Sequence, residues 1–408
     1  METHLFFAQS YCHIHAGGGK MRTGVNNMKL VIQGLPEEGW KKIGDSFIDC
    51  TVIRDHGSIH LCTGCFSCWN RTPGKCVIHD GYQNLGSLIH HADEVIVLSR
   101  YTYGGFSGFV KNVFDRCLGY VLPMFEVVRG ETHHKKRYPE NKPFTFIFYG
   151  PEFSEEEKDS ARNYVRAVCA NIRGYVKAVE FRKAQAVPHP GRNPEYPEQQ
   201  KALLLNTSVR HEKGNSAMLA SMLEKHLHKE TETVPLMKYS NRREELIERL
   251  DEVSDLVICT PLYVDGLPSQ LIRFMEQAEK EYTGRNKRVY VLANMGLYES
   301  SQLENLFSQI RQWCNCMGFE YCGGLGISAG ELIGGITAIV PFGIGPSKTC
   351  AAGIKRLGKA IEHGEKIPEL FAEPWKFPRS LYILIANVSW NRAAKRNGIR
   401  PKDMYRRL

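Results

Sequence analysis

The chain has 408 residues, of which 42% are hydrophobic and 24% charged, and its formal net charge is +9. This composition predicts a globular protein, and the length predicts two or three domains. No run of eighteen apolar residues indicates a membrane span, and the N-terminus lacks a secretory pattern. We therefore expect a cytoplasmic protein with no membrane partner, in which most of the 13 cysteines are reduced thiols.

Much of the positive charge lies at the end of the chain. From Lys376 to Leu408 there are nine Lys/Arg residues and a single acid, Asp403. A solvated basic helical tail is the favoured interpretation, and the alternative is a tail that docks on an acidic surface or near a phosphate. We expect no nucleic-acid partner, since neither zinc-finger spacing nor an RNA-binding aromatic motif accompanies the charge.

The first part of the chain alternates short strands with amphipathic helices. Residues 1–27 have no clear periodicity, and we expect them to form a disordered extension. The apolar patterns that follow define a first α/β domain over residues 28–185. Its predicted strands are 29–35, 51–55, 94–99, 144–150 and 175–181, and its predicted helices are 81–92, 108–122 and 154–174.

A proline-rich segment, residues 186–200, reads as a linker, after which the same plan restarts. A second α/β domain is predicted over residues 201–345, with a basic tail over 346–408. Its strands are expected at 201–208, 256–261, 288–294 and 320–327, and its helices at 215–227, 243–253, 269–282 and 301–318. Alternating strands and helices predict parallel sheets covered on both faces.

Two segments resemble each other across the halves. Residues 92–116 (ADEVIVLSRYTYGGFSGFVKNVFDR) align without gaps on residues 254–278 (SDLVICTPLYVDGLPSQLIRFMEQA). In each, an apolar strand ends in a Tyr/Gly loop that opens a helix. Because ligands bind outside the carboxyl ends of parallel strands, both loops are candidate ligand walls. A role limited to shaping turns is the alternative.

A polar loop opens a helix in the second half. NTSVRHEKGNSAMLASML, residues 206–223, follows a strand and offers hydroxyls, backbone N–H groups, Arg210 and a helix N-terminus to an anion. It matches neither the G-x-x-x-x-G-K-[ST] nor the G-x-G-x-x-G pattern, so a monophosphate fits better than ATP or a dinucleotide. The corresponding stretch of the first half, residues 34–42, carries Glu37 and Glu38 instead, and we infer that it has lost its phosphate site.

Four cysteines lie within CTGCFSCWNRTPGKC, residues 62–76, with the spacing C-x2-C-x2-C-x7-C. A [4Fe–4S] cluster ligated by Cys62, Cys65, Cys68 and Cys76 suits this compact arrangement. Structural zinc also takes four thiolates, but its sites are more often two pairs separated by a longer insert. A metal-free loop scaffold or a set of redox thiols is the third interpretation, and the spacing excludes none of the three.

These motifs carry a resemblance to a family. TSVRHEKGNS followed by TPLYVDGLPSQL resembles the NAD(P)H-dependent FMN reductase branch of the flavodoxin-like superfamily. CTGCFSCWNRTPGKCVIHDGYQ followed by YTYGGFSGFVKNVFDR is similar to its iron–sulfur flavoprotein members. The resemblance covers most of residues 28–335. It implies an α/β protein with two tandem flavodoxin-like doubly wound parallel sheets, FMN at the strand ends, and NAD(P)H as electron donor.

Matched position by position, the resemblance implies two groups of cofactor-binding residues. Those that would hold the FMN phosphate are Ser208, Arg210, Asn215 and Ser216. Those that would line the isoalloxazine ring are Pro261, Leu262, Tyr263 and Val264 on one side and Asn294, Met295 and Gly296 on the other. No residue is expected to act as an obligatory nucleophile, because the cofactor supplies the chemistry.

The sequence departs from the family pattern in one respect. Members usually carry the phosphate loop and the cysteines in one domain, which dimerisation repeats, whereas here the cysteines lie in the first half and the phosphate loop in the second. Our hypothesis is an intrachain pseudo-dimer with one FMN per chain, which pairs no further or dimerises again.

The expected function is an oxidoreductase that passes electrons from NAD(P)H through FMN to an unidentified small-molecule or protein acceptor. Two alternatives remain. One is a non-enzymatic flavodoxin-like electron carrier, and the other is a zinc- or thiol-containing interaction module without flavin.

Overall fold

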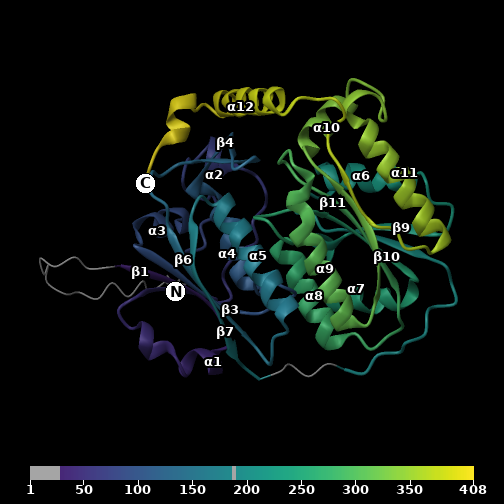
Figure 1. Cartoon of the computed structure of the whole chain (residues 1–408), viewed down its shortest axis with the longest axis horizontal. Helices are drawn as coiled ribbons and strands as arrows, with labels where there is room; N and C mark the ends of the chain where they lie inside the picture. The colour runs from purple at the N-terminus through teal and green to yellow at the C-terminus, as the bar shows by residue number, and fades with distance from the viewer. Residues whose placement is uncertain (1–27, 186–189) are drawn as a thin grey trace, which may run out of the picture.

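The structure is a computed structural model that describes residues 28–185 and 190–408. The predicted extension, 1–27, lies outside the described residues, as does the start of the linker. The described chain forms two parallel sheets, each covered by helices, and an α12 helix that lies across both halves (Figure 1). No helix among these residues is long and apolar enough to cross a membrane.

The first sheet has five parallel strands in the order β2-β1-β3-β6-β7. Its strands are β1 (Lys29–Gly34), β2 (Thr51–Arg54), β3 (Glu94–Arg100), β6 (Pro143–Gly150) and β7 (Tyr175–Lys183). Its helices are α1 (Glu37–Lys41), α2 (Ser67–Asn70), α3 (Leu85–His91), α4 (Gly108–Arg116) and α5 (Glu155–Asn171). Leu30 and Ile32 pack on one face while Val31 packs on the other, as expected of a strand buried on both sides.

The second sheet has six parallel strands in the order β13-β12-β11-β10-β8-β9. Its strands are β8 (Ala202–Asn206), β9 (Thr231–Pro235), β10 (Asp255–Pro261), β11 (Arg288–Asn294), β12 (Glu320–Ile327) and β13 (Glu369–Ala372). Its helices are α6 (Asn215–Glu224), α7 (Arg243–Arg249), α8 (Ser269–Glu281), α9 (Glu304–Met317), α10 (Gly330–Thr337) and α11 (Lys348–His363). The strands β9 and β13 at its two edges are not in the sequence prediction, and β13 lies beyond residue 345.

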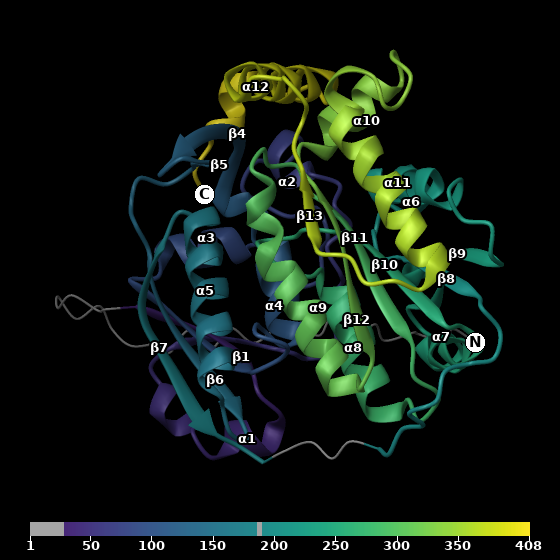
Figure 2. The ribbon, with the colours of Figure 1, turned by 45° about the vertical axis from the view of Figure 1, so that its right-hand side comes forward.

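Four helices form the layer between the two sheets, with α4 packed on α8 and α5 packed on α9 (Figure 2). The contact between α4 and α8 is close, since a Cβ added to Gly108 would lie 2.5 Å from Cγ of Arg273. Polar pairs cross the same boundary: Arg100 Nη2 lies 2.7 Å from Glu276 Oε1, and the Tyr101 hydroxyl lies 2.6 Å from Gln312 Oε1.

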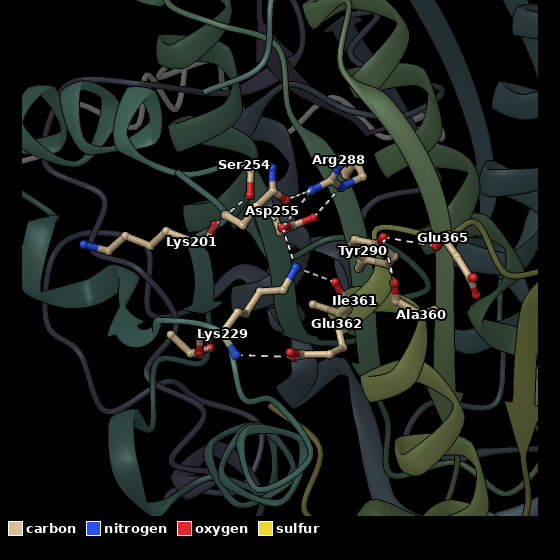
Figure 3. Close-up of polar contacts among 12 residues, drawn as sticks. Lys201, Lys229, Ser254, Asp255, Arg288, Tyr290, Ala360, Ile361, Glu362 and Glu365 are labelled. Carbon is tan, nitrogen blue, oxygen red and sulfur yellow. Dashed lines mark hydrogen bonds and ion pairs between the residues drawn. The ribbon is translucent and has the colours of Figure 1, made fainter. Parts of the chain in front are cut away.

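A buried carboxylate anchors the start of the second sheet (Figure 3). Asp255, the first residue of β10, is fully buried and accepts hydrogen bonds from Arg288 Nε at 2.6 Å, Lys229 Nζ at 3.0 Å and Ser254 Oγ at 2.7 Å. Burial acts to raise the pKa of this carboxyl, but these donors outweigh it, so the pKa lies below its usual value.

The structure aligns the two halves one residue away from the alignment predicted from the sequence. Glu94 opens β3 and pairs with Lys29, just as Asp255 opens β10 and pairs with Ala202. Glu94 therefore corresponds to Asp255, whereas the ungapped alignment matches Asp93 to it. The error arose because the alignment paired Gly104 with Gly266, while the residue that closes the turn in the first half is Gly105.

The predicted helix 108–122 is wrong beyond Arg116. After α4 the chain turns into an antiparallel hairpin of β4 (Val121–Val128) and β5 (Glu131–Lys136). Its turn carries Arg129 and Gly130 at φ 52° and 92°, the left-handed geometry that tight hairpins need.

The basic tail is not simply a solvated helix. From β13 the chain enters α12 (Arg379–Arg396), which lies along β4. Asn387 receives a hydrogen bond from the Phe125 N–H at 2.8 Å, and Arg137 Nη1 donates to the carbonyls of Met404 and Arg406 at 2.6 and 2.8 Å. The last residues thus return to the first half, and we call residues 379–408 the strap.

Candidate functional site: a pocket between the two halves

A pocket with a cavity volume of about 170 Å³ lies at the carboxyl ends of β8, β10 and β11. The second half supplies one side of it, and loops of the first half together with the strap supply the other. All the residues that the sequence assigned to FMN line this pocket: Ser208, Arg210, Asn215, Ser216, Pro261, Leu262, Tyr263, Val264, Asn294, Met295 and Gly296.

One end of the pocket is built by the loop after β8 and the first turn of α6. The Ser208 N–H donates to Asn206 Oδ1 at 3.1 Å, and Ser208 Oγ accepts from the Arg210 N–H at 3.2 Å, which folds the loop back on itself. Gly214 precedes α6, and a Cβ there would lie 2.9 Å from Ser208 Oγ. This end therefore combines hydroxyls, a guanidinium and free helix N–H groups, a set that binds oxyanions.

The floor of the pocket is set by the turn after β10. Tyr263 and Gly266 bridge the turn, and Val264 and Asp265 between them have φ of 40° and 58°. Asp265 is thus one of the two central residues of this turn. Asp265 itself is buried, and burial raises the pKa of its carboxyl to about 7, against the stabilising hydrogen bond from Asn171 of the first half.

The wall after β11 is tied to the helix that holds the polar end. Asn294 Nδ2 donates to Ser216 Oγ at 2.7 Å, and the Met295 N–H donates to the carbonyl of Ile327 at 3.0 Å. Leu262 donates through its N–H to the carbonyl of Asn294 at 2.8 Å, so the two loops are fixed relative to each other. Glu331 of α10, which was not predicted, also lines the pocket.

Aromatic side chains close the opposite side. Phe66 and Trp69 stack with ring centroids 5.1 Å apart, and Trp390 of the strap meets both edge-on at 5.4 and 5.3 Å. Trp69 is held in place because its Nε1–H donates to the carbonyls of Leu118 and Val121. Trp69 is 2% exposed and also lines the pocket.

The hairpin adds Phe125 and His134 to this wall. His134 is partly buried in the hairpin, and burial lowers the pKa of its imidazole to about 4. The ring is therefore a neutral aromatic surface at pH 7. The sequence offered no signal for Phe125, His134 and Trp390, because their place depends on contacts distant along the chain.

The cysteine loop contacts the pocket through its first residues. Cys62 lines the pocket, and Gly64, at φ 60°, lies against the second half, where an added Cβ would be 3.0 Å from the Tyr263 hydroxyl. An ion pair between Arg116 Nη1 and Asp80, at 2.5 Å, braces the end of the loop.

The four thiols lie close enough to influence one another but do not form a metal site. Burial raises the pKa of Cys62 to about 12 and that of Cys68 well above the usual value, so both thiols stay protonated. For Cys65, burial acts in the same direction, but hydrogen bonds from Ser67 and Thr63 outweigh it and lower the pKa. Within residues 28–185 and 190–408, no group of three or more His, Cys, Asp or Glu side chains is arranged to hold a metal ion. The arrangement of these thiols therefore gives the predicted cluster no support.

The fold and the pocket together define an α/β protein with a pocket at the carboxyl ends of parallel strands, the position where such sheets usually bind ligands. No protein-family model matches the sequence, and no curated protein matches it.

The chain is similar in structure to several solved proteins. One is an FMN-dependent NADH-azoreductase from Bacillus anthracis in complex with FMN, with 14% identity over 41% of this chain and 100% of that one, and a TM-score of 0.31. Another is an NAD(P)H:quinone oxidoreductase from Methanothermobacter marburgensis, with 13% identity over 41% and 98% and a TM-score of 0.30. A third is an NADH:FMN oxidoreductase, with 13% identity over 45% and 99% and a TM-score of 0.33. At these values the likeness carries no functional argument, and function has to be argued from the pocket.

Proposed function

We propose that this chain is a flavin-dependent oxidoreductase that holds one FMN in the pocket between its halves and passes electrons from NAD(P)H to an acceptor. The observation that carries the proposal is that every residue assigned to FMN from the sequence lines this one pocket.

The polar end fits the phosphate of FMN. Ser208 and Ser216 offer hydroxyls, Arg210 offers a guanidinium, and the first turn of α6 offers N–H groups and the positive end of the helix dipole. Gly214 leaves open the space that a side chain would take from Ser208 Oγ. These residues would bind and orient the phosphate, and none of them is required to react.

The rest of the pocket fits a flat aromatic ring. Backbone and side chains of residues 261–264 and 294–296 form two walls, and the aromatic cluster of Phe66, Trp69 and Trp390 excludes water from the third. Bound FMN would supply two-electron acceptance from NAD(P)H and electron release to an acceptor. The chain's contribution is to position that ring in an apolar, shielded space.

One flavin per chain follows from the difference between the halves. Gln33 pairs with Leu98 of β3, and Asn206 pairs with Cys259 of β10, so these two residues correspond. Four positions further on, the second half has Arg210 where the first half has Glu37. A carboxylate at that place repels a phosphate, which supports the loss of the first-half site. We propose that the halves arose by tandem duplication and now divide the work as an intrachain pseudo-dimer.

The cysteine loop is left out of the proposed electron path, because its thiols are not arranged for a metal. In this proposal it contributes Cys62 and Gly64 to the pocket wall as a scaffold. Iron and zinc determination on anaerobically purified protein tests this assignment, and about four iron atoms per chain would restore the [4Fe–4S] interpretation.

The test of the proposed function is flavin binding followed by reduction. Purified protein is saturated with FMN, freed of excess by gel filtration and assayed for flavin per chain, and NADPH or NADH is then added without oxygen. We expect about one FMN per chain and bleaching of the flavin band within the time of mixing. Flavin that binds but bleaches slowly would favour the electron carrier, and protein that takes up no FMN would refute the proposal.

A matched pair of variants locates the flavin. Arg210→Gln removes a charge that faces the pocket, and we expect FMN affinity to fall by about tenfold to a hundredfold. Lys213→Gln removes a charge from the same loop at a residue that does not line the pocket, and affinity should stay near the wild-type value. Equal losses in both variants would show that only the net charge matters.

A further inference from the structure

A second cavity, with a volume of about 730 Å³, lies at the carboxyl ends of β1, β2 and β3. The first half contributes residues 33–37 and 54–56 to it, and helices α7 and α8 of the second half contribute the opposite wall. In the order β2-β1-β3 of the first sheet, this is the point where the strand order reverses, the usual ligand position of such sheets.

This cavity is the counterpart of the proposed flavin pocket, because corresponding residues line both. With Glu94 matched to Asp255, Glu276 corresponds to Asp115, and each lines its own cavity. The loops after the first strand also agree: the Leu35 N–H donates to Gln33 Oε1, as the Ser208 N–H donates to Asn206 Oδ1.

The chemistry of the two cavities differs. Arg100 takes the place that Pro261 has in the flavin pocket, and its guanidinium is engaged by Glu276 at 2.7 Å. Glu37 takes the place of Arg210, and it lies 4.0 Å from Arg54. A charged pair where the flat wall would be, and a carboxylate where the phosphate would be, disfavour FMN here.

The wall from the second half carries both charges, with Glu276 and Glu281 beside its basic residues, and two of its guanidinium groups lack a hydrogen-bonded carboxylate in the part of the chain that the structure describes. Nη2 of Arg273 is buried and has no hydrogen-bond acceptor among the described residues, and its nearest carboxylate, Asp55, lies 3.9 Å away. Arg243 has no carboxylate at ion-pair distance within residues 28–185 and 190–408, and the pKa of its guanidinium is lowered by burial and by the charge of Arg273. Two guanidinium groups that repel each other at the wall of an open cavity are stabilised by an oxyanion between them.

We propose that this second cavity binds a phosphate-bearing ligand, whose oxyanion is held between the guanidinium groups of Arg243 and Arg273. Guanidinium groups pair with phosphate oxygens in two parallel hydrogen bonds each, and a cavity of about 730 Å³ has room for a nucleotide or for a free phosphate. The site is separate from the flavin pocket and does not depend on FMN binding there.

Calorimetric titration of the full-length protein with inorganic phosphate and with ADP tests the proposal. Arg243→Gln and Arg273→Gln should each weaken binding by about tenfold or more. Arg242→Gln is the matched control, because Arg242 precedes Arg243, pairs with Glu245 at 3.2 Å and lies outside the cavity. The Arg242→Gln variant should bind phosphate and ADP with the affinity of the wild type.

The outcomes separate the two ligand sources and the two cavities. Tighter binding of ADP identifies a nucleotide as the source, and equal binding of both probes identifies the free oxyanion. Absence of binding by either probe overturns the proposal, as does a loss in Arg242→Gln equal to that in Arg243→Gln. Binding that only Arg210→Gln removes would place the ligand in the flavin pocket and also overturn it, leaving the proposed flavin function untouched.

Discussion

Gly64 of the cysteine loop lies directly against the hydroxyl of Tyr263, so a residue of the first half touches the floor of the pocket in the second. The backbone of Gly64 has φ 60°, and a Cβ there would approach the Tyr263 oxygen to 3.0 Å. This contact joins the four-cysteine segment to the proposed flavin ring wall, and it can be tested directly.

Gly64→Val should weaken FMN binding. The substitution strains the left-handed backbone and pushes the loop away from Tyr263, and we expect a loss of about tenfold in FMN affinity, measured by quenching of flavin fluorescence. Gly57→Val is the control, because Gly57 has φ 75° and nothing within 4 Å of an added Cβ. The two variants share the backbone strain, and equal affinities would contradict the contact as the cause.

Trp390→Ala should open the aromatic side of the pocket. Trp390 packs edge-on against Phe66 and Trp69, and its removal exposes that wall to water. We expect FMN to dissociate about tenfold faster, followed by stopped-flow dilution into a flavin trap. Trp375→Ala removes a tryptophan that is 37% exposed and lies off the pocket, and its rate should match the wild type. An unchanged rate in both variants would mean that the strap does not cover the site.

Asp255→Asn should destabilise the second sheet. The change leaves the cationic groups of Arg288 and Lys229 beside a neutral amide, and we expect a loss of about 3 kcal/mol in the free energy of unfolding at pH 7. Glu94→Gln makes the corresponding change in the first sheet, where Lys177 is half exposed, and should cost about 1 kcal/mol.

The carboxylate of Asp255 also makes the free energy of unfolding depend on pH. Because the folded state holds the pKa of Asp255 below its unfolded value, the stabilisation is complete above about pH 4 and is lost as the pH falls through the folded pKa. Urea unfolding of wild type and Asp255→Asn at pH 7 and pH 3 checks this, and the difference between them should shrink in acid. A difference that stays constant would contradict the assignment.

Asp265→Asn, unlike Asp255→Asn, should stabilise the protein, and it should do so at high pH. Burial raises the pKa of Asp265 to about 7, so the folded state holds the proton more tightly than the unfolded state, and stability is lost as the pH rises from about 4 to 7. An amide avoids that cost, and we expect the variant to gain on the wild type by up to about 3 kcal/mol at pH 8 and by little at pH 4. Thermal unfolding across this range measures the gain, and Asp159→Asn, at an exposed helical carboxylate, should show none.

The strands and the polar end of the pocket were predictable because their signals are local. Runs such as residues 29–34 and 202–206 are apolar on both faces, and a strand followed by Ser208, Arg210 and the start of α6 indicates an anion site. Spacing along the chain is enough to find such features. The capping box of Ser154 and Glu157 at the start of α5 was predictable for the same reason, and both of its hydrogen bonds are present.

The remainder depends on contacts between distant residues. Nothing next to His134 in the sequence indicates that it will pack against Trp69 and Phe125, and Trp390 lies 321 residues from Trp69, which it packs against. The hairpin β4–β5 was missed because its apolar start continues the pattern of α4. The alignment of the two halves was shifted by one residue because it matched Gly104 to Gly266. The paired strand starts and the turns match Gly105 to Gly266 instead.

Because of the strap, the two walls of the pocket are held together within one chain. The chain leaves the first half once, through the linker, and the strap brings it back, so the halves are held by a connection in the sequence and by a second, non-covalent one through α12. A site shared between two separate chains empties when the protein is diluted, because its walls part. Here both walls belong to one molecule, and the local concentration of one for the other is fixed by the chain itself. The pocket therefore keeps both of its walls at any concentration of the protein.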